Sequence, residues 1–129
     1  MDSLPVFTPE QFSRRPAIAQ VEAELKKWLR QIAVEERVDF IARLWAINYP
    51  LALILVQSSQ LPVKEIEALL RKWLAAGHYN AAQKIIEYFS VMLGERKFWK
   101  IVSEVELSSV MRDFINYYSK GRLDEQQRG

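Results

Sequence analysis

The chain has 129 residues, of which 50% are hydrophobic and 26% are charged, so it is too apolar for a disordered chain and too charged for an integral membrane protein. Its 18 basic and 16 acidic residues leave a formal charge of only +2, which lacks the strong positive field of a dedicated nucleic-acid binder. There is no cysteine, which excludes disulfides, thiol catalysis and thiolate metal sites. Residues 1–16 lack the apolar segment of a signal peptide, so we expect a cytoplasmic protein.

The first helix signals lie close to the N-terminus. Thr8 is a capping residue, Pro9 suits a first turn, and Gln11 stands three positions after the cap, which predicts a short helix. From residue 17 to 32, apolar residues recur at three- and four-residue spacing and predict an amphipathic helix. The stripe then shifts phase, which predicts a bend or a new helix near Ala33. The stripes are Ile18, Val21, Leu25, Trp28, Leu29 and Ile32 before the shift, and Val34, Val38, Ile41 and Trp45 after it.

Pro50 predicts another break, because proline lacks the amide donor of a helix interior and clashes with the preceding turn. Residues 49–56 are apolar on every side, and such a helix lies either at the centre of a core or partly under another chain. A membrane span needs about 20 apolar residues, so this segment is too short to be one. If the segment is a contact surface, for a homodimer or another protein, we expect the binding residues to be Trp45, Tyr49, Leu51 and Leu53.

Two further helices are predicted on either side of Gly77. Pro62 suits the first turn of the helix before this glycine, and a second helix follows over residues 79–93 and ends at Gly94. Each glycine is placed to act as the C-terminal cap of its helix. The short turn between the helices predicts an antiparallel helical hairpin at the centre of the chain.

Five residues of this hairpin resemble, in order and spacing, positions of a tetratricopeptide unit, which would imply a helical repeat. Leu70, Phe89 and Gly94 depart from that pattern, and no second copy follows at the required period of about 34 residues. An ordinary helical hairpin is therefore the favoured interpretation. The five residues are Leu69, Trp73, Gly77, Tyr79 and Ala82.

The last apolar stripe shifts phase between Ser103 and Ser108, which predicts a bend there, and Gly121 is placed to cap the final helix. Residues 122–129 are polar and predict a flexible tail. No segment of convincing length alternates with a period of two, and no long linker divides the chain. The sequence therefore predicts one all-α domain over residues 1–121, a compact bundle of about six helices. The last stripe contains Phe98, Val102 and Val105 before the shift, and Leu107, Met111, Phe114 and Tyr118 after it.

A small basic and aromatic cluster is predicted on one helical face. Arg96, Lys97 and Lys100 can lie together there, beside Phe98 and Trp99. Such a cluster could receive an acidic protein surface, RNA phosphates or membrane headgroups. In the alternative interpretation it is a solvated helix edge whose two aromatic rings turn into the core. Its candidate binding residues are Arg96, Lys97, Trp99 and Lys100.

Little in the sequence supports catalysis. His78 is the only histidine, so a two-histidine metal site is excluded, and there is neither a glycine-rich phosphate loop nor a convincing pair of catalytic acids. We expect no cofactor and no enzymatic activity. The sequence favours a protein-binding module, an adaptor, assembly factor or regulator, that acts through an apolar helical surface. The alternative is a nucleic-acid-associated regulator that uses the basic and aromatic cluster.

Overall fold

The computed structural model describes residues 7–13 and 19–120. Within these residues the protein is all-α, as predicted, with seven α-helices, two short 3₁₀ helices and no strand. The total of seven exceeds the predicted six because each phase shift in the apolar stripe separates two helices. The chain divides into two compact units, residues 1–62 and 63–129, and the single domain over residues 1–121 stays a prediction. The predicted cap at Gly121 and the tail at residues 122–129 lie outside the described residues.

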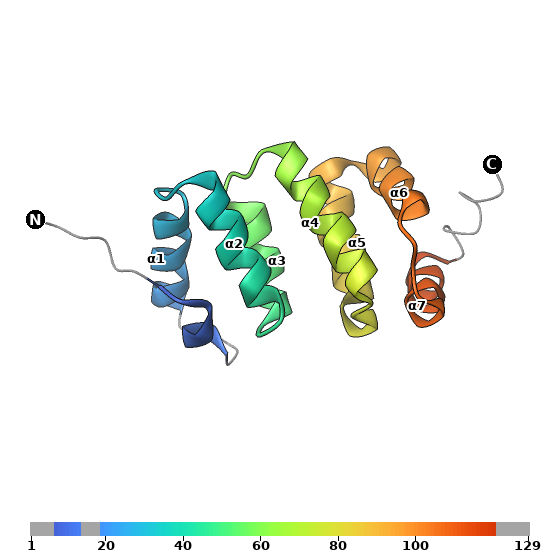
Figure 1. The fold of residues 1–129 in the computed structure, drawn as a ribbon, viewed down its shortest axis with the longest axis horizontal. Helices are drawn as coiled ribbons and strands as arrows, with labels where there is room; N and C mark the ends of the chain where they lie inside the picture. Colours follow the sequence, from blue (N-terminus) through green and yellow to red (C-terminus); the bar gives the residue numbers. More distant parts are fainter. Residues whose placement is uncertain (1–6, 14–18, 121–129) are drawn as a thin grey trace, which may run out of the picture. The chain divides into compact units, whose positions relative to one another are not determined.

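The first unit is built around the pair α2 and α3, which lie side by side and run antiparallel (Figure 1). The short 3₁₀ helix η1 packs against α2. The predicted capping signal at its start is confirmed, since the backbone N–H of Thr8 donates to Gln11 Oε1 at 2.8 Å. The elements of this unit are η1 (Pro9–Phe12), α1 (Ala19–Leu29), α2 (Val34–Trp45) and α3 (Tyr49–Ser58).

The predicted break before Pro50 is confirmed, and Asn48 explains how α3 begins there. The Asn48 side chain accepts a hydrogen bond from the backbone N–H of Leu51 at 3.3 Å, which caps the helix. Its amide also donates to the carbonyl of Phe12 at 2.9 Å and so ties η1 to α3. Pro50 occupies the first turn, where no amide donor is needed. Among the described residues, no helix has both the length and the apolar character needed to cross a membrane.

Arg37 on α2 connects the ends of α1 and α3. Its guanidinium donates to the carbonyls of Arg30 at 3.1 Å and Ile32 at 2.9 Å, after α1. It also donates to the carbonyl of Ser59 at 3.1 Å, after α3. Carbonyls at the C-terminal end of a helix lack helical donors and carry partial negative charge, so one cation satisfies two helix ends.

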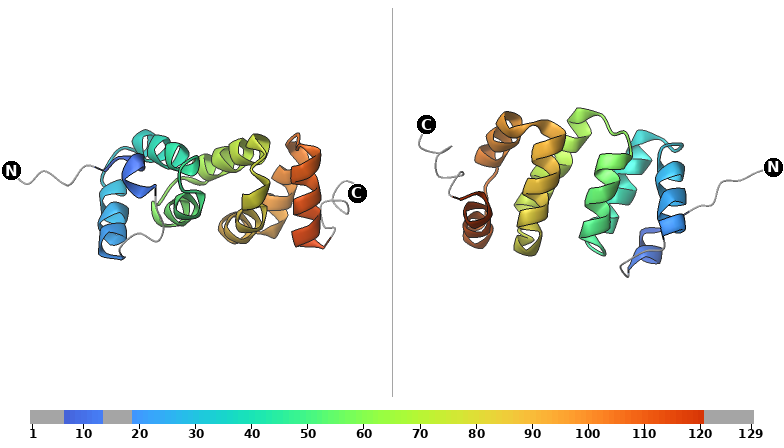
Figure 2. Two further views of the ribbon diagram at one scale, coloured as in Figure 1. Left: turned by 90° about the horizontal axis from the view of Figure 1, so that it is seen from below. Right: turned by 180° about the vertical axis from the view of Figure 1, so that it is seen from behind.

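The second unit contains the predicted hairpin. Helices α4 and α5 lie side by side and run antiparallel (Figures 1 and 2), and Gly77 between them has a φ of +73°. Trp73 and Phe89 meet across the hairpin with ring centroids 5.9 Å apart, and both are fully buried. The elements of this unit are α4 (Val63–Ala76), η2 (Tyr79–Ala81), α5 (Ala82–Leu93), α6 (Glu95–Glu104) and α7 (Ser109–Ser119).

Helix α7 packs against α5 with a face that matches the predicted stripe only in part. Ser108 caps the helix by accepting the backbone N–H of Met111 at 3.1 Å. Met111 and Ile115 are the buried residues of α7, whereas Phe114 is half-buried and Tyr118 is exposed. The predicted stripe through Met111, Phe114 and Tyr118 is therefore wrong at its last position, because the helix turns Tyr118 outward.

Candidate partner-binding surfaces

The four candidate residues around α3 lie close together but expose little surface. Trp45 is buried, Leu51 and Leu53 have no exposed area, and only Tyr49 is half-buried. The rings of Trp45 and Tyr49 lie 5.6 Å apart. The apolar segment is thus covered within the chain, as the central-helix alternative expects. A role of these residues in partner binding stays a prediction.

The basic residues of α6 are exposed around a hollow of about 500 Å³, but their aromatic neighbours are not. Phe98 and Trp99 are buried, and the Trp99 indole N–H donates to Glu95 at 3.0 Å. Lys97 forms an ion pair with Glu67 at 3.5 Å. The structure therefore agrees with the alternative interpretation, in which the aromatic rings turn into the core. What remains at the surface is Arg96, Lys97 and Lys100.

A row of aromatic rings lies on the outer side of α7, and we call it the aromatic face of α7. Tyr79 from η2 lies 5.1 Å from Phe114, measured between ring centroids. Phe114 lies 6.1 Å from Tyr118, which in turn lies 5.1 Å from Tyr117. The last three side chains and Asp113 line a hollow of about 350 Å³. The aromatic face of α7 consists of Tyr79, Phe114, Tyr117 and Tyr118.

This face exists because α7 is apolar on two sides and buries only one. Val110, Phe114, Tyr117 and Tyr118 follow the spacing of one helical face, and the side chain of Tyr117 is 78% exposed. Sequence reasoning missed Tyr79 and Tyr117. The signal for them was the excess of large apolar residues around the last helix, since a surface helix normally buries a single stripe.

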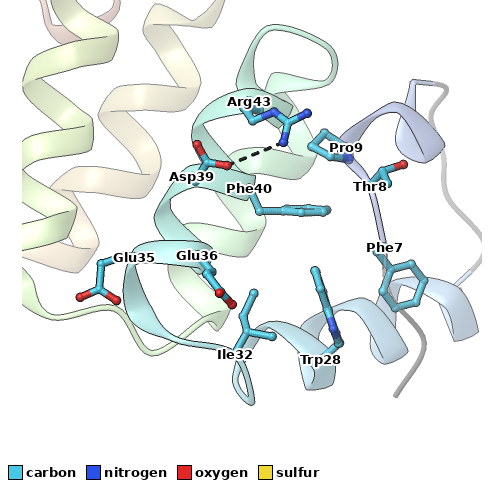
Figure 3. A pocket seen from close by; sticks show the side chains of 10 residues that line it. All are labelled: Phe7, Thr8, Pro9, Trp28, Ile32, Glu35, Glu36, Asp39, Phe40 and Arg43. Atoms are coloured by element: carbon cyan, nitrogen blue, oxygen red, sulfur yellow. Dashed lines mark ion pairs between the residues drawn. The ribbon is translucent and has the colours of Figure 1, made fainter. Parts of the chain in front are cut away.

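A third hollow, of about 420 Å³, lies in the first unit between η1, α1 and α2 (Figure 3). Trp28 and Phe40 meet edge to face with centroids 5.4 Å apart, and Phe7 meets Trp28 in the same way at 5.6 Å. Phe40 is buried, whereas Phe7 and Trp28 are half-buried and so form part of the wall. We call this site the acidic–aromatic hollow. Its lining residues are Phe7, Thr8, Pro9, Trp28, Ile32, Glu35, Glu36, Asp39, Phe40 and Arg43.

Charge in the acidic–aromatic hollow is unbalanced. Its lining contains three carboxylates, from Glu35, Glu36 and Asp39, but a single cation, Arg43. That cation is already engaged, because its guanidinium lies 3.7 Å from Asp39 and 3.5 Å from Glu10. Sequence reasoning missed this site because it assigned Trp28 to a core stripe and did not bring residues 7–9 next to residues 28–43.

The described residues show no arrangement typical of metal chemistry. No three histidine, aspartate or glutamate side chains in this part of the chain are grouped so that they could hold a metal ion. His78 is exposed at the turn between α4 and α5. The acidic–aromatic hollow lies in the first unit, and the aromatic face of α7 and the exposed basic residues of α6 lie in the second.

Comparison of the chain with models of protein families, with curated proteins and with solved structures finds no match in any of the three. The resemblance of the hairpin to a tetratricopeptide unit thus rests on its five residues alone.

Proposed function

We propose that the protein is a non-enzymatic helical module that binds another protein through the aromatic face of α7. The observation that carries the proposal is the row of rings that ends in Tyr117, whose side chain is 78% exposed. Tyrosine and phenylalanine are enriched in protein interfaces because they bury large areas and lose little conformational freedom. A row of such rings on a rigid helix is an anchor suited to an adaptor, assembly factor or regulator.

A protein partner fits this face better than a nucleic acid. Aromatic rings can stack on unpaired bases, but such sites also need cations that follow the phosphate backbone. The charged residue that lines the hollow of this face is Asp113, which repels phosphate. The exposed cations of α6 could follow a phosphate backbone, but they lack exposed rings for base stacking because Phe98 and Trp99 beside them are buried.

The proposal is tested by affinity capture from cells of the native host with matched variants. The double variant Tyr117→Ser and Tyr118→Ser removes two exposed rings and should lose the partner that the wild-type protein retains. Val91→Ser on α5 is the control, since Val91 is 74% exposed and does not line the hollow. Retention of the same proteins by the double variant would overturn the proposal.

Two further measurements identify the kind of partner. Light scattering over a range of concentrations would show a mass of two chains if the partner is a second copy, and the double variant should then be monomeric. Binding of single-stranded RNA that falls steeply with salt, and that Lys97→Ala with Lys100→Ala weakens, would support the nucleic-acid alternative instead.

A further inference from the structure

We infer that the acidic–aromatic hollow of the first unit binds an arginine side chain presented by a segment of a partner protein. The inference rests on residues of the first unit and does not depend on the aromatic face of α7. Two independent features of the hollow support it, the arrangement of its rings and the sign of its charge.

Two partly exposed rings form a wall on which a flat cation can stack. Trp28 and Phe7 are half-buried and lie 5.6 Å apart, whereas the buried Phe40 packs edge to face against Trp28 (Figure 3). The faces of aromatic rings are electron-rich and attract cations, and tryptophan is the strongest of them. A guanidinium is planar and weakly hydrated, so it stacks on such rings more readily than an ammonium does. A volume of about 420 Å³ is within the range of small binding pockets.

The carboxylates supply the charge that such an occupant needs. Glu36 is directed toward Ile32 at the edge of the hollow, whereas Glu35 is directed away from it (Figure 3). Acids in the first turn of a helix also favour the helix dipole, which accounts for two glutamates at the start of α2. The dipole does not explain why Glu36 lines the same hollow as the half-buried rings of Trp28 and Phe7. An arginine seated on the rings would offer Glu36 the forked donor that matches a carboxylate.

A metal ion does not fit the same lining. Hard cations require several oxygen ligands that converge on one point. No group of three acidic or histidine side chains in the described residues converges in this way. Asp39 is moreover paired with Arg43, at 3.7 Å. An organic cation that uses both the rings and one carboxylate satisfies the site better.

The test is an NMR titration of the full chain with three acetylated pentapeptides that differ only at the central residue, which is arginine, citrulline or lysine. Citrulline keeps the shape of arginine without its charge. The arginine peptide should shift the indole N–H signal of Trp28 saturably, and the citrulline peptide should leave it unchanged. Equal shifts with arginine and citrulline, or no shift with arginine at millimolar concentration, would overturn the inference. Binding of the lysine peptide as tight as that of the arginine peptide would overturn the choice of arginine.

Variants assign the binding to the hollow. Glu36→Gln should weaken the arginine peptide about tenfold, which is the loss of one charge-assisted pair. Glu35→Gln should weaken it less, and Glu24→Gln is the control because this exposed glutamate of α1 does not line the hollow. The same affinity in Glu36→Gln and Glu24→Gln would refute the assignment. The comparison of the peptides on wild-type protein remains decisive even if a variant folds poorly.

Discussion

Arg37 donates hydrogen bonds to backbone carbonyls at the ends of two helices. These hydrogen bonds should contribute to the free energy of unfolding. It donates to the carbonyls of Arg30, Ile32 and Ser59 at 2.9 to 3.1 Å. Lysine keeps the charge but cannot reach three carbonyls with a rigid fork. We expect Arg37→Lys to lower the free energy of unfolding by about 1–3 kcal/mol.

Equilibrium unfolding in urea measures this loss. The exposed Arg96 of α6 provides the control, since Arg96→Lys makes the same exchange at a solvent-exposed position. Equal stability of the two variants would show that the hydrogen bonds of Arg37 contribute nothing net.

At the same scale, individual residues show what the sequence could and could not reveal. Asn48 and Pro50 act locally, so the break before α3 was predictable. Arg37 acts on carbonyls 22 and 23 positions away in sequence, at Ser59 and Gln60, and no local pattern identifies such partners. The same limit hid the hollow, in which Phe7 contacts Trp28 and Trp28 contacts Phe40.

At the scale of elements, the hairpin of α4 and α5 depends on the backbone of Gly77. Its φ of +73° lies in the left-handed region, which costs a residue with a Cβ atom about 1–2 kcal/mol. A Cβ there would meet Ser108 Oγ at an ordinary contact distance of 3.7 Å, so the strain comes from the backbone. We expect Gly77→Ala to destabilise the protein by about that amount in urea unfolding.

Gly77→Asn is the matched comparison, because asparagine adopts the left-handed conformation more readily than alanine. The asparagine variant should therefore be more stable than the alanine variant. Equal stability of the alanine and asparagine variants would contradict this account, because it would show that the left-handed backbone of Gly77 is not the reason for a glycine at this position.

The orientation of α7 shows why a predicted helix does not define a predicted surface. The apolar pattern predicts a helix at α7, but two faces of this helix are apolar enough to be the buried one. Packing against α5 selected Met111 and Ile115, which left Tyr117 and Tyr118 at the surface. Helix α4 has a single apolar stripe and leaves no such choice. All residues of its predicted stripe are buried except the first, Val63, which is 50% exposed. The buried residues are Ile66, Leu69, Leu70, Trp73 and Leu74.

At the scale of the whole molecule, the candidate surfaces fall in different units. The acidic–aromatic hollow belongs to residues 1–62, and the aromatic face of α7 belongs to residues 63–129. The apolar segment at residues 49–56, which the sequence favoured as a contact surface or a central helix, is covered within the chain. We therefore propose the contact at α7, whose rings are exposed, in place of α3.

The central claim, that the aromatic face of α7 contacts a partner protein, is tested most directly by site-specific photo-crosslinking in the native host. A photoreactive residue at position 117 is compared with one at position 91, because Tyr117 and Val91 are similarly exposed, at 78% and 74%. We expect a discrete crosslinked protein, or a crosslinked second copy of this chain, from position 117 and none from position 91. The same products from both positions, or no product from position 117, would contradict the claim.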